Sequence, residues 1–280
     1  MGTGVRPVAA LAVALAVASA PPAQAQGGAP GPPPAAGPPA ATGRAAASPA
    51  LDPGRPARPF APGERADYDV ALGAIHAGTA RIVVGEPSGE VWPIVLLAKS
   101  EGVLSILGIR ESLTSFLDAA SGLPRGSLLV ASELGDRHED RTTFDRAAGT
   151  ATLQVRRKGR LAERTVEVAR DAHDLPTAIA RLRSELREPG QRVEIPVLSG
   201  AQAFVLAAEA EAREAIEVPA GRHAALRVRL RLGFSGPFSG GDVRVWLSDD
   251  ARRVPLAVEA PFAIGTLRAR LAAYRPGAER

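Results

Sequence analysis

Cysteine and asparagine are both absent from this chain of 280 residues. Without cysteine there is no disulfide, no thiolate nucleophile, no cysteine-ligated zinc or iron–sulfur centre and no lipid-modified cysteine at a processed N-terminus. Glycine and asparagine are the residues that most readily adopt the positive φ angles of tight turns. Because asparagine is missing, we expect glycine to occupy most of those turn positions.

Aromatic residues and lysines are scarce. Aromatics make up 4 % of the chain, and its only lysines are Lys99 and Lys158. The formal charge is +4, from 34 basic and 30 acidic residues, and the isoelectric point is near 10.2. Basic and acidic residues are interleaved, as in RHED at residues 137–140, and form no basic stripe with stacking aromatics. This pattern argues against a nucleic-acid partner.

The first 25 residues have the three parts of a secretory signal peptide. Arg6 supplies the positive start, residues 8–20 form an apolar run, and residues 23–25 read A-Q-A, an A-x-A cleavage site. The apolar run is shorter than the roughly 20 residues that cross a bilayer. We predict cleavage after Ala25 and a periplasmic or secreted protein. No later apolar run reaches spanning length, so we expect no transmembrane segment in the mature chain.

Residues 26–59 consist almost entirely of proline, alanine and glycine. Such a composition buries too little apolar surface to offset the entropy of ordering, which predicts a disordered linker. Residues 60–275 contain short runs of alternating apolar and polar residues separated by glycine turns, the pattern of an antiparallel meander. We expect one β-rich domain there. Pro93 interrupts an apolar run at residues 91–98, which indicates a sheet edge or a bulge.

One segment, at about residues 174–187, has helical periodicity. Its apolar positions 175, 179, 182 and 186 lie on one helix face, Asp174 is a candidate N-cap, and Pro176 falls in the first turn. The fold predicted for the chain is therefore mainly β. We expect an open curved sheet or partial barrel with this amphipathic helix packed on it.

The search for catalytic or metal-binding motifs gives no site. His76, His138, His173 and His223 are the only histidines, and no H-E-x-x-H motif is present. The segment at residues 233–236 lacks the pattern of a nucleophile elbow. No phosphate-binding or dinucleotide-binding glycine motif occurs. We assign no catalytic residue, no metal ligand and no cofactor, although a triad assembled from distant positions stays open.

Four aromatic residues are the candidates for contact with an apolar ligand. Phe234 and Phe238 lie in a glycine-rich loop that could cover a cleft, while Tyr68 and Trp246 lie in predicted strands. The glycine loop could equally be an ordinary connection whose aromatics fold back onto the sheet.

The segment DVRVWLSDDARRVPLAVE, residues 242–259, is interpreted as a hairpin. Serine and aspartate favour turns because their side chains bond nearby backbone amides, and arginines can neutralise the aspartates. A proline there indicates an edge or a bulge. The residues assigned to this structural hairpin are Trp246, Ser248, Asp249, Asp250, Arg253 and Pro255.

Three segments together resemble one family. FAPGERADYDV at residues 60–70 with GTA at 78–80, RHEDRTTFD at 137–145, and WLSDDARRVP at 246–255 are similar to the opening, central and terminal motifs of the domain-of-unknown-function family 3108 (DUF3108). The resemblance implies an exported bacterial protein dominated by β-strands, without an established activity. It transfers no catalytic residues. His76 departs from the pattern, since lysine or proline is more usual there.

Three functions remain open from the sequence. The first is a non-catalytic domain of the cell envelope that binds an apolar or glycolipid ligand, or an envelope protein as partner. The second is a hydrolase of envelope polymers that uses a histidine as base. The third is a structural or adhesive module tethered by the proline-rich linker.

Overall fold

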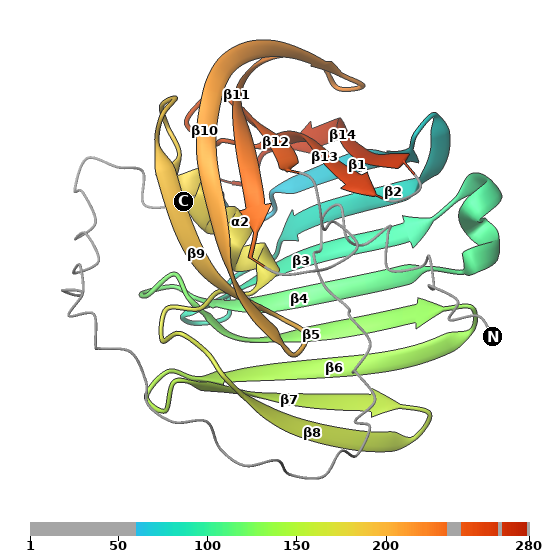
Figure 1. The fold of residues 1–280 in the computed structure, drawn as a ribbon, viewed down its shortest axis with the longest axis vertical. Coiled ribbons are helices and arrows are strands. Elements are labelled where there is room, and N and C mark those ends of the chain that lie inside the picture. Colours follow the sequence, from blue (N-terminus) through green and yellow to red (C-terminus); the bar gives the residue numbers. More distant parts are fainter. Residues whose placement is uncertain (1–59, 234–241, 263–264, 279–280) are drawn as a thin grey trace, which may run out of the picture. The chain divides into compact units, whose positions relative to one another are not determined.

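The computed structural model describes residues 60–233, 242–262 and 265–278. Predictions for the signal peptide, the linker, Phe234 and Phe238 concern residues outside these ranges. The described part is dominated by strands (Figure 1). The elements in chain order are β1 (Arg65–Leu72), β2 (Ile75–Val84), β3 (Val91–Ser100), the 3-10 helix η1 (Gly102–Leu107), β4 (Arg110–Asp118), β5 (Pro124–Glu133), β6 (Asp136–Asp145), β7 (Thr150–Arg157), β8 (Arg160–Glu167), the helix α2 (Leu175–Glu185), β9 (Arg192–Ser199), β10 (Gln202–Val218), β11 (Gly221–Leu232), β12 (Val243–Ser248), β13 (Pro255–Phe262) and β14 (Gly265–Arg275).

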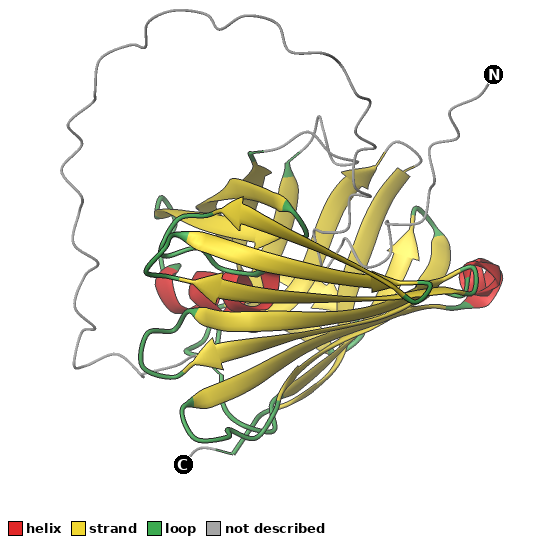
Figure 2. Ribbon diagram, turned by 90° about the horizontal axis from the view of Figure 1, so that it is seen from below, coloured by secondary structure: helices red, strands yellow, loops and turns green. Residues whose placement is uncertain are grey.

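All fourteen strands belong to one antiparallel sheet. Its spatial order is β8-β7-β6-β5-β4-β3-β2-β1-β14-β13-β12-β11-β10-β9, so β8 and β9 are the two edges and the sheet does not close by strand pairing. The pairing of β1 with β14 joins the two ends of the described chain. Figure 2 shows the strands fanning out from one end. The predicted fold class, an open curved sheet with one packed helix, is confirmed.

Short connections with positive φ angles make this meander. The β5–β6 turn has Leu134 at φ 49° and Gly135 at φ 80°, and the β7–β8 turn has Lys158 at φ 50° and Gly159 at φ 74°. Two successive left-handed residues match the right-handed twist of the flanking strands, which favours tight hairpins. Glycine fills the second position of both turns, as expected for a chain without asparagine.

Helix α2 packs on one face of the sheet, called here the inner face. Asp174 caps it by accepting hydrogen bonds from the Thr177 amide (3.1 Å) and hydroxyl (2.7 Å). Ile179 and Arg183 lie around one small crevice with Ile82 and Leu96 of β2 and β3. The predicted helix therefore forms, from residue 175 to 185, with its apolar stripe toward the sheet.

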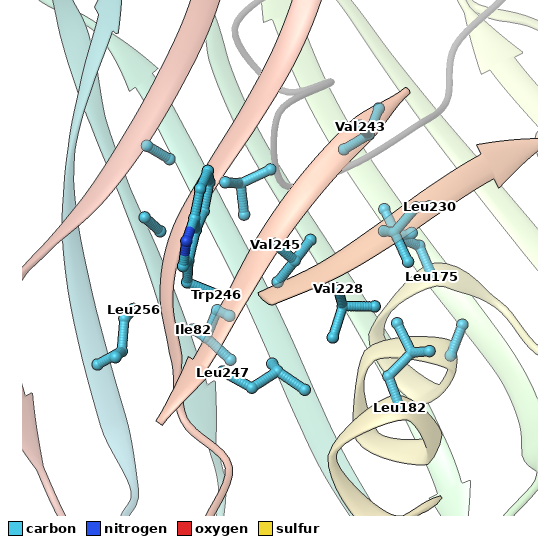
Figure 3. Packing of buried hydrophobic residues seen from close by; sticks show 14 of the residues in the cluster. Ile82, Leu175, Leu182, Val228, Leu230, Val243, Val245, Trp246, Leu247 and Leu256 are labelled. Atoms are coloured by element: carbon cyan, nitrogen blue, oxygen red, sulfur yellow. The ribbon is translucent and has the colours of Figure 1, made fainter. Parts of the chain in front are cut away.

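The main core lies between the inner face and α2. Val228, Val245 and Leu247 point inward from the later strands, whereas Trp246 lies on the other side of β12 (Figure 3). Val245 and Leu247 alternate with Trp246 because successive side chains of a strand point to opposite faces. Alanine, valine and leucine dominate the buried set, as the low aromatic content requires.

A second, smaller core links the two ends of the sheet. Leu198 of β9 packs with Phe144, Ala151 and Leu153 of β6 and β7. Beside them Arg146 donates hydrogen bonds to the carbonyls of Arg170 (3.1 Å), Ala172 (2.7 Å) and Pro124 (2.6 Å). Here the sheet edges approach each other through side chains and a loop, without joining their backbones as neighbouring strands.

The expectation for Pro93 needs correction. Pro93 lies in β3, which is an internal strand between β2 and β4, and its pairing with Phe116 is regular. A proline fits at this position because the pairing of β2 with β3 stops beside it. The last pair is Val84 with Ile94, so Pro93 has no paired residue on β2. Pro255, by contrast, lies at a shift of register between β12 and β13. In the described part of the chain no helix is long and apolar enough to span a bilayer.

Candidate functional site

A groove of about 660 Å³ crosses seven neighbouring strands, from β14 through β1 to β6. Six strand spacings of about 4.8 Å give it a length of roughly 30 Å. Three cross-strand rows line it. The first contains Asp67, Arg81, Leu97, Ser112 and Val130; the second contains Asp69, Thr79, Lys99, Arg110, Ser132 and Arg137; between them lie Tyr68, Ala80, Ala98, Glu111 and Ala131.

The register shows on which face the groove lies. Directly opposed residues of an antiparallel sheet point to the same face, and neighbours along a strand point to opposite faces. The middle row belongs to the inner face, and Tyr68, Ala80 and Ala131 are buried there at 1 %, 4 % and 3 % exposure. The two flanking rows therefore point to the opposite, outer face. The groove runs between them, with the strand backbone as its floor.

One end of the groove is acidic but largely neutralised. Asp67 accepts hydrogen bonds from Arg65 (2.7 Å) and from Arg81. Partial burial opposes ionisation of Asp67, but these two arginines hold its pKa below the ordinary value. Asp69, in the next row, faces Arg270 of β14 across the strand pair. This end offers a ligand polar groups with little net charge.

The other end of the groove is basic. Lys99 and Arg110 are directly opposed residues of β3 and β4, and Arg137 is separated from Arg110 only by Ser132. Lys99 bonds Glu101 at 2.6 Å, whereas Arg110 and Arg137 form no ion pair within the part of the chain that the structure describes. Like charges on opposed strand positions are destabilising. Three cations in this row are therefore an unusual cost for a purely structural sheet.

Beneath the basic end, the inner face carries a carboxylate. Burial, with a smaller contribution from the neighbouring Glu133, raises the pKa of Glu111 to about 7. Burial likewise raises the pKa of Asp140 on β6, against the opposing charges of His138 and Arg157. These acids share the inner face. Glu111 is opposed to Ala131, and Asp140 is opposed to Leu129, which lies two residues from Ala131 on β5 and so points to the same face. The carboxyl group of Glu111 therefore lies on the inner face of the sheet, opposite the groove on the outer face.

The structure separates the aromatic candidates. Tyr68 lines the groove only from the floor, and its hydroxyl donates a 2.9 Å hydrogen bond to the Pro255 carbonyl. Burial raises the pKa of Tyr68 far above its usual range. Trp246 lies away from the groove on β12, where its indole donates to Glu214 at 2.6 Å. Phe234 and Phe238 lie outside the described residues.

The segment at residues 242–259 contains β12, the start of β13 and the turn between them. Asp250 Oδ1 accepts from the Ser248 hydroxyl (2.8 Å) and from the amides of Arg252 (2.9 Å) and Arg253 (3.1 Å). Arg253 adopts a left-handed φ of 49° and is buried. Its guanidinium donates to Asp249 at 2.6 Å and to the Arg187 carbonyl at 3.0 Å. This turn therefore ties the end of α2 to the sheet.

None of the four histidines is among the described residues that line the groove. His76 contacts one carboxylate, Glu101, at 3.3 Å. His173 is buried, and burial with nearby arginines lowers its pKa to about 3. Within the described ranges no group of three or more histidine, aspartate or glutamate side chains is placed to hold a metal ion.

Sequence reasoning missed the groove residues because they come from strands far apart in the chain. Lys99, Arg110 and Arg137 become neighbours only through the register of β3 to β6. A usable signal was present: each lies within three residues of a glycine that marks the connection between two strands. Pairing such positions across predicted hairpins would have collected them.

Comparison with solved structures supports the fold. A β-barrel-like protein of the domain of unknown function DUF1849 from Brucella abortus matches with a TM-score of 0.55 and 10 % identity, covering 78 % of this chain and 99 % of that one. A Bacteroides fragilis protein described as exported, with a YmcC-like fold, matches with a TM-score of 0.31 and 10 % identity, covering 78 % and 98 %. The latter score is too low to carry a conclusion. At 10 % identity the former shows the fold alone.

Comparison of sequences identifies the family. No curated protein matches the chain. The family model for proteins of unknown function named DUF3108 matches residues 67–272. That span includes every strand from within β1 to within β14, and with them the groove and the β12–β13 turn. The chain therefore belongs to the DUF3108 family.

Proposed function

We propose that this chain is an exported, non-enzymatic domain of the bacterial cell envelope that binds an elongated amphiphile of the glycolipid class in the outer-face groove. The observation that carries this proposal is the row of Lys99, Arg110 and Arg137 at one end of a groove roughly 30 Å long. Export rests on the signal peptide predicted for residues 1–25.

The groove matches such a ligand in its distribution of polarity. Leu97 of β3 and Val130 of β5 give an apolar lining to the wall of the groove that faces the basic row. The cations at the β4–β6 end suit phosphate or carboxylate groups of a head, because arginine binds such groups with charge-assisted hydrogen bonds. The neutralised Asp67 and the hydroxyl of Thr79 at the other end suit sugar hydroxyls. An uncharged lipid would leave Arg110 and Arg137 without an anionic partner.

Blocking the groove tests the proposal directly. Ser112 points into the middle of the groove from β4, and Thr114 points to the same face two residues further on but does not line it. The probe is a fluorescent monophosphorylated glycolipid below its micelle-forming concentration, with binding followed by anisotropy. We expect Thr114→Trp to bind like the unmodified chain and Ser112→Trp to lose affinity by about tenfold or more, since a filled groove excludes the ligand.

Charge removal tests the orientation of the ligand. We expect Arg110→Gln with Arg137→Gln to weaken binding of the phosphorylated glycolipid by about tenfold, the equivalent of one charge-assisted contact, and to leave a neutral glycolipid unaffected. The matched control is Arg160→Gln with Arg222→Gln, two exposed arginines outside the groove. Equal binding by Ser112→Trp and Thr114→Trp contradicts the groove as the site.

A further inference from the structure

Four strand connections lie side by side at one end of the sheet. The turns after β1, β3, β5 and β7 share this end because each strand in this meander pairs with its successor. The β3–β4 connection is extended by η1, which stands beyond the strand ends in Figure 1 and, in Figure 2, at the opposite end of the strands from α2. We call this end the apolar rim, defined by Ile75, Val103, Ile106 and Leu134.

The apolar rim exposes large hydrophobic side chains to an unusual degree. Ile75 is 55 % exposed, Val103 70 %, Ile106 82 % and Leu134 65 %. A fifth, Leu161, follows the neighbouring β7–β8 turn, so five of the seven exposed large hydrophobics in the described ranges gather at this end. Single exposed hydrophobics are ordinary, but a cluster on adjacent loops marks an interaction surface.

Backbone contacts hold these loops together as one surface. The Leu134 amide donates to the Leu107 carbonyl at 2.8 Å, and the Glu101 amide donates to the Ala77 carbonyl at 3.0 Å. Leu134 itself occupies a left-handed conformation that bulky residues rarely adopt. The turn requires that conformation, but it does not require a large apolar side chain that lies in solvent, so the choice of leucine favours a contact surface.

Cations stand directly behind the apolar rim. Lys99 is the last residue but one of β3, the strand before η1. Arg110 is the first residue of β4, the strand after η1, and Arg137 follows the β5–β6 turn. The facing acids are largely offset: Glu101 is bonded by Lys99, and Asp136 by Arg157 and Lys158.

The charges beside these turns are positive on balance. They comprise Lys99, Arg110, Arg137, Arg157, Lys158 and Arg160 against Glu101, Glu133 and Asp136. Apolar tips backed by basic residues are the pattern of proteins that insert into the interfacial layer of a negatively charged bilayer.

We propose that the apolar rim docks this protein on an anionic lipid bilayer, with Val103 and Ile106 of η1 entering the interface and Lys99, Arg110 and Arg137 meeting lipid phosphates. This contact is separate from ligand binding in the groove, although the basic row is shared. Docking places the basic end of the groove next to the membrane surface.

The test is co-sedimentation with vesicles made of phosphatidylglycerol and phosphatidylcholine in equal amounts. The protein is purified after export, and its N-terminal residue is determined by mass spectrometry. All variants then share one N-terminus, so its contribution to binding is constant. We expect the unmodified protein to bind these vesicles, to bind pure phosphatidylcholine weakly, and to lose binding as salt is raised.

Paired variants separate the rim from other surfaces. We expect Val103→Ser with Ile106→Ser to lower vesicle binding by about tenfold or more, because two apolar insertions are removed. The matched control, Phe116→Ser with Val205→Ser, changes two exposed hydrophobics away from this end and is expected to bind normally. Circular dichroism confirms that each variant is folded.

Three outcomes overturn the proposal. The first is absence of vesicle binding by the unmodified protein, and the second is equal binding by the rim variant and its control. The third is loss of vesicle binding in Ser112→Trp, which would assign the lipid contact to the groove. Sedimentation velocity adds a check. A dimer that the rim substitutions dissociate, with vesicle binding unchanged, makes the rim an interface between copies and also contradicts the proposal. Failure of glycolipid binding in the groove leaves this test unaffected.

Discussion

Arg183 of α2 and Glu64, the residue before β1, form an ion pair of 2.8 Å with both side chains almost fully buried, at 4 % and 5 % exposure. Arg183 also donates to the Arg252 carbonyl at 3.0 Å, and its guanidinium lies 5.8 Å from the centre of the Phe60 ring. One side chain thus joins the start of the sheet, the helix and the β12–β13 turn.

Removing one partner of this pair is expected to destabilise the fold strongly. Glu64→Leu and Arg183→Leu each leave a buried charge or carbonyl without its partner, at a cost of about 3–5 kcal/mol in the free energy of unfolding. The double variant is expected to lose less than the sum. Urea denaturation measures this, with Arg181→Ala in the half-exposed Arg181–Glu185 pair as control, expected within about 0.5 kcal/mol. Additive losses would show that the two residues are not coupled.

The β12–β13 turn is expected to be a stability determinant. Asp250→Ala removes three hydrogen bonds to one carboxylate oxygen, and Asp249→Ala removes the carboxylate partner of buried Arg253. By analogy with lost caps, we expect each to lower the free energy of unfolding by about 1–2 kcal/mol. Thermal melting tests this. Asp249→Ala with unchanged melting and lost ligand binding would instead make that aspartate part of a binding site.

The smaller core is expected to depend on the shape of Arg146. Its guanidinium reaches three carbonyls and stacks 4.4 Å from the centre of the Phe144 ring. A lysine carries its three N–H donors on one nitrogen and cannot replace the two nitrogens, Nη1 and Nη2, that reach these carbonyls. We expect Arg146→Lys to cost about 2–4 kcal/mol and to speed amide exchange in residues 170–174 and 196–198. Exposed Arg141→Lys is the control. Unchanged exchange would mean that the loop is held by other contacts.

His173 is expected to make stability depend on pH below neutrality. Burial, with Arg181 and Arg146 nearby, lowers its pKa in the folded chain to about 3, against about 6.5 when unfolded. Between these values only the unfolded chain binds the proton, so the contribution is complete above pH of about 6.5 and is lost as pH falls toward 3. We expect His173→Phe to reduce the slope between pH 6 and pH 4 by up to about 1.4 kcal/mol per pH unit.

The control for this pH effect is Val205→Ala, which alters an exposed residue without a titratable group and should leave the slope unchanged. The measurement is the urea midpoint at a series of pH values with ionic strength held constant. An identical slope in His173→Phe and the unmodified protein would show that other groups carry the acid sensitivity.

The fold was largely predictable because its determinants are local. Alternation around Tyr68 predicts a strand, and Asp174 with Leu182 and Leu186 predicts the helix and its buried face. The long strand β10 was harder to read. Its residues 209–217 read EAEAREAIE, so the alternation breaks at Arg213 and Glu214, and several of the charged residues have partners on neighbouring strands, as Glu209 has with Arg192.

The candidate site was not predictable by motif because nothing in it is local. Arg110 is part of a basic site only because Lys99 and Arg137 lie in the same cross-strand row. These two residues are 11 and 27 positions away in the chain, and strand register brings them together. Trp246 was attractive as an aromatic candidate, but its indole is committed to Glu214. Sheet sites of this kind require the pairing of strands to be known before the residues can be chosen.

The open sheet leaves β8 with an unpaired backbone edge, and the sequence of that strand determines what the edge can join. Suppose that β8 pairs antiparallel with β8 of a second copy, around a twofold axis, to extend one sheet. Opposed residues must then point to the same face of that sheet, so their residue numbers differ by an even number. For RLAERTVE, the registers centred on residues 162, 163, 164 and 165 oppose Arg160 to Arg164, Glu163 to itself, Arg164 to itself and Glu163 to Glu167. Each meets like charge with like charge. The protein thus leaves its sheet unclosed without inviting a second copy to pair with it through β8.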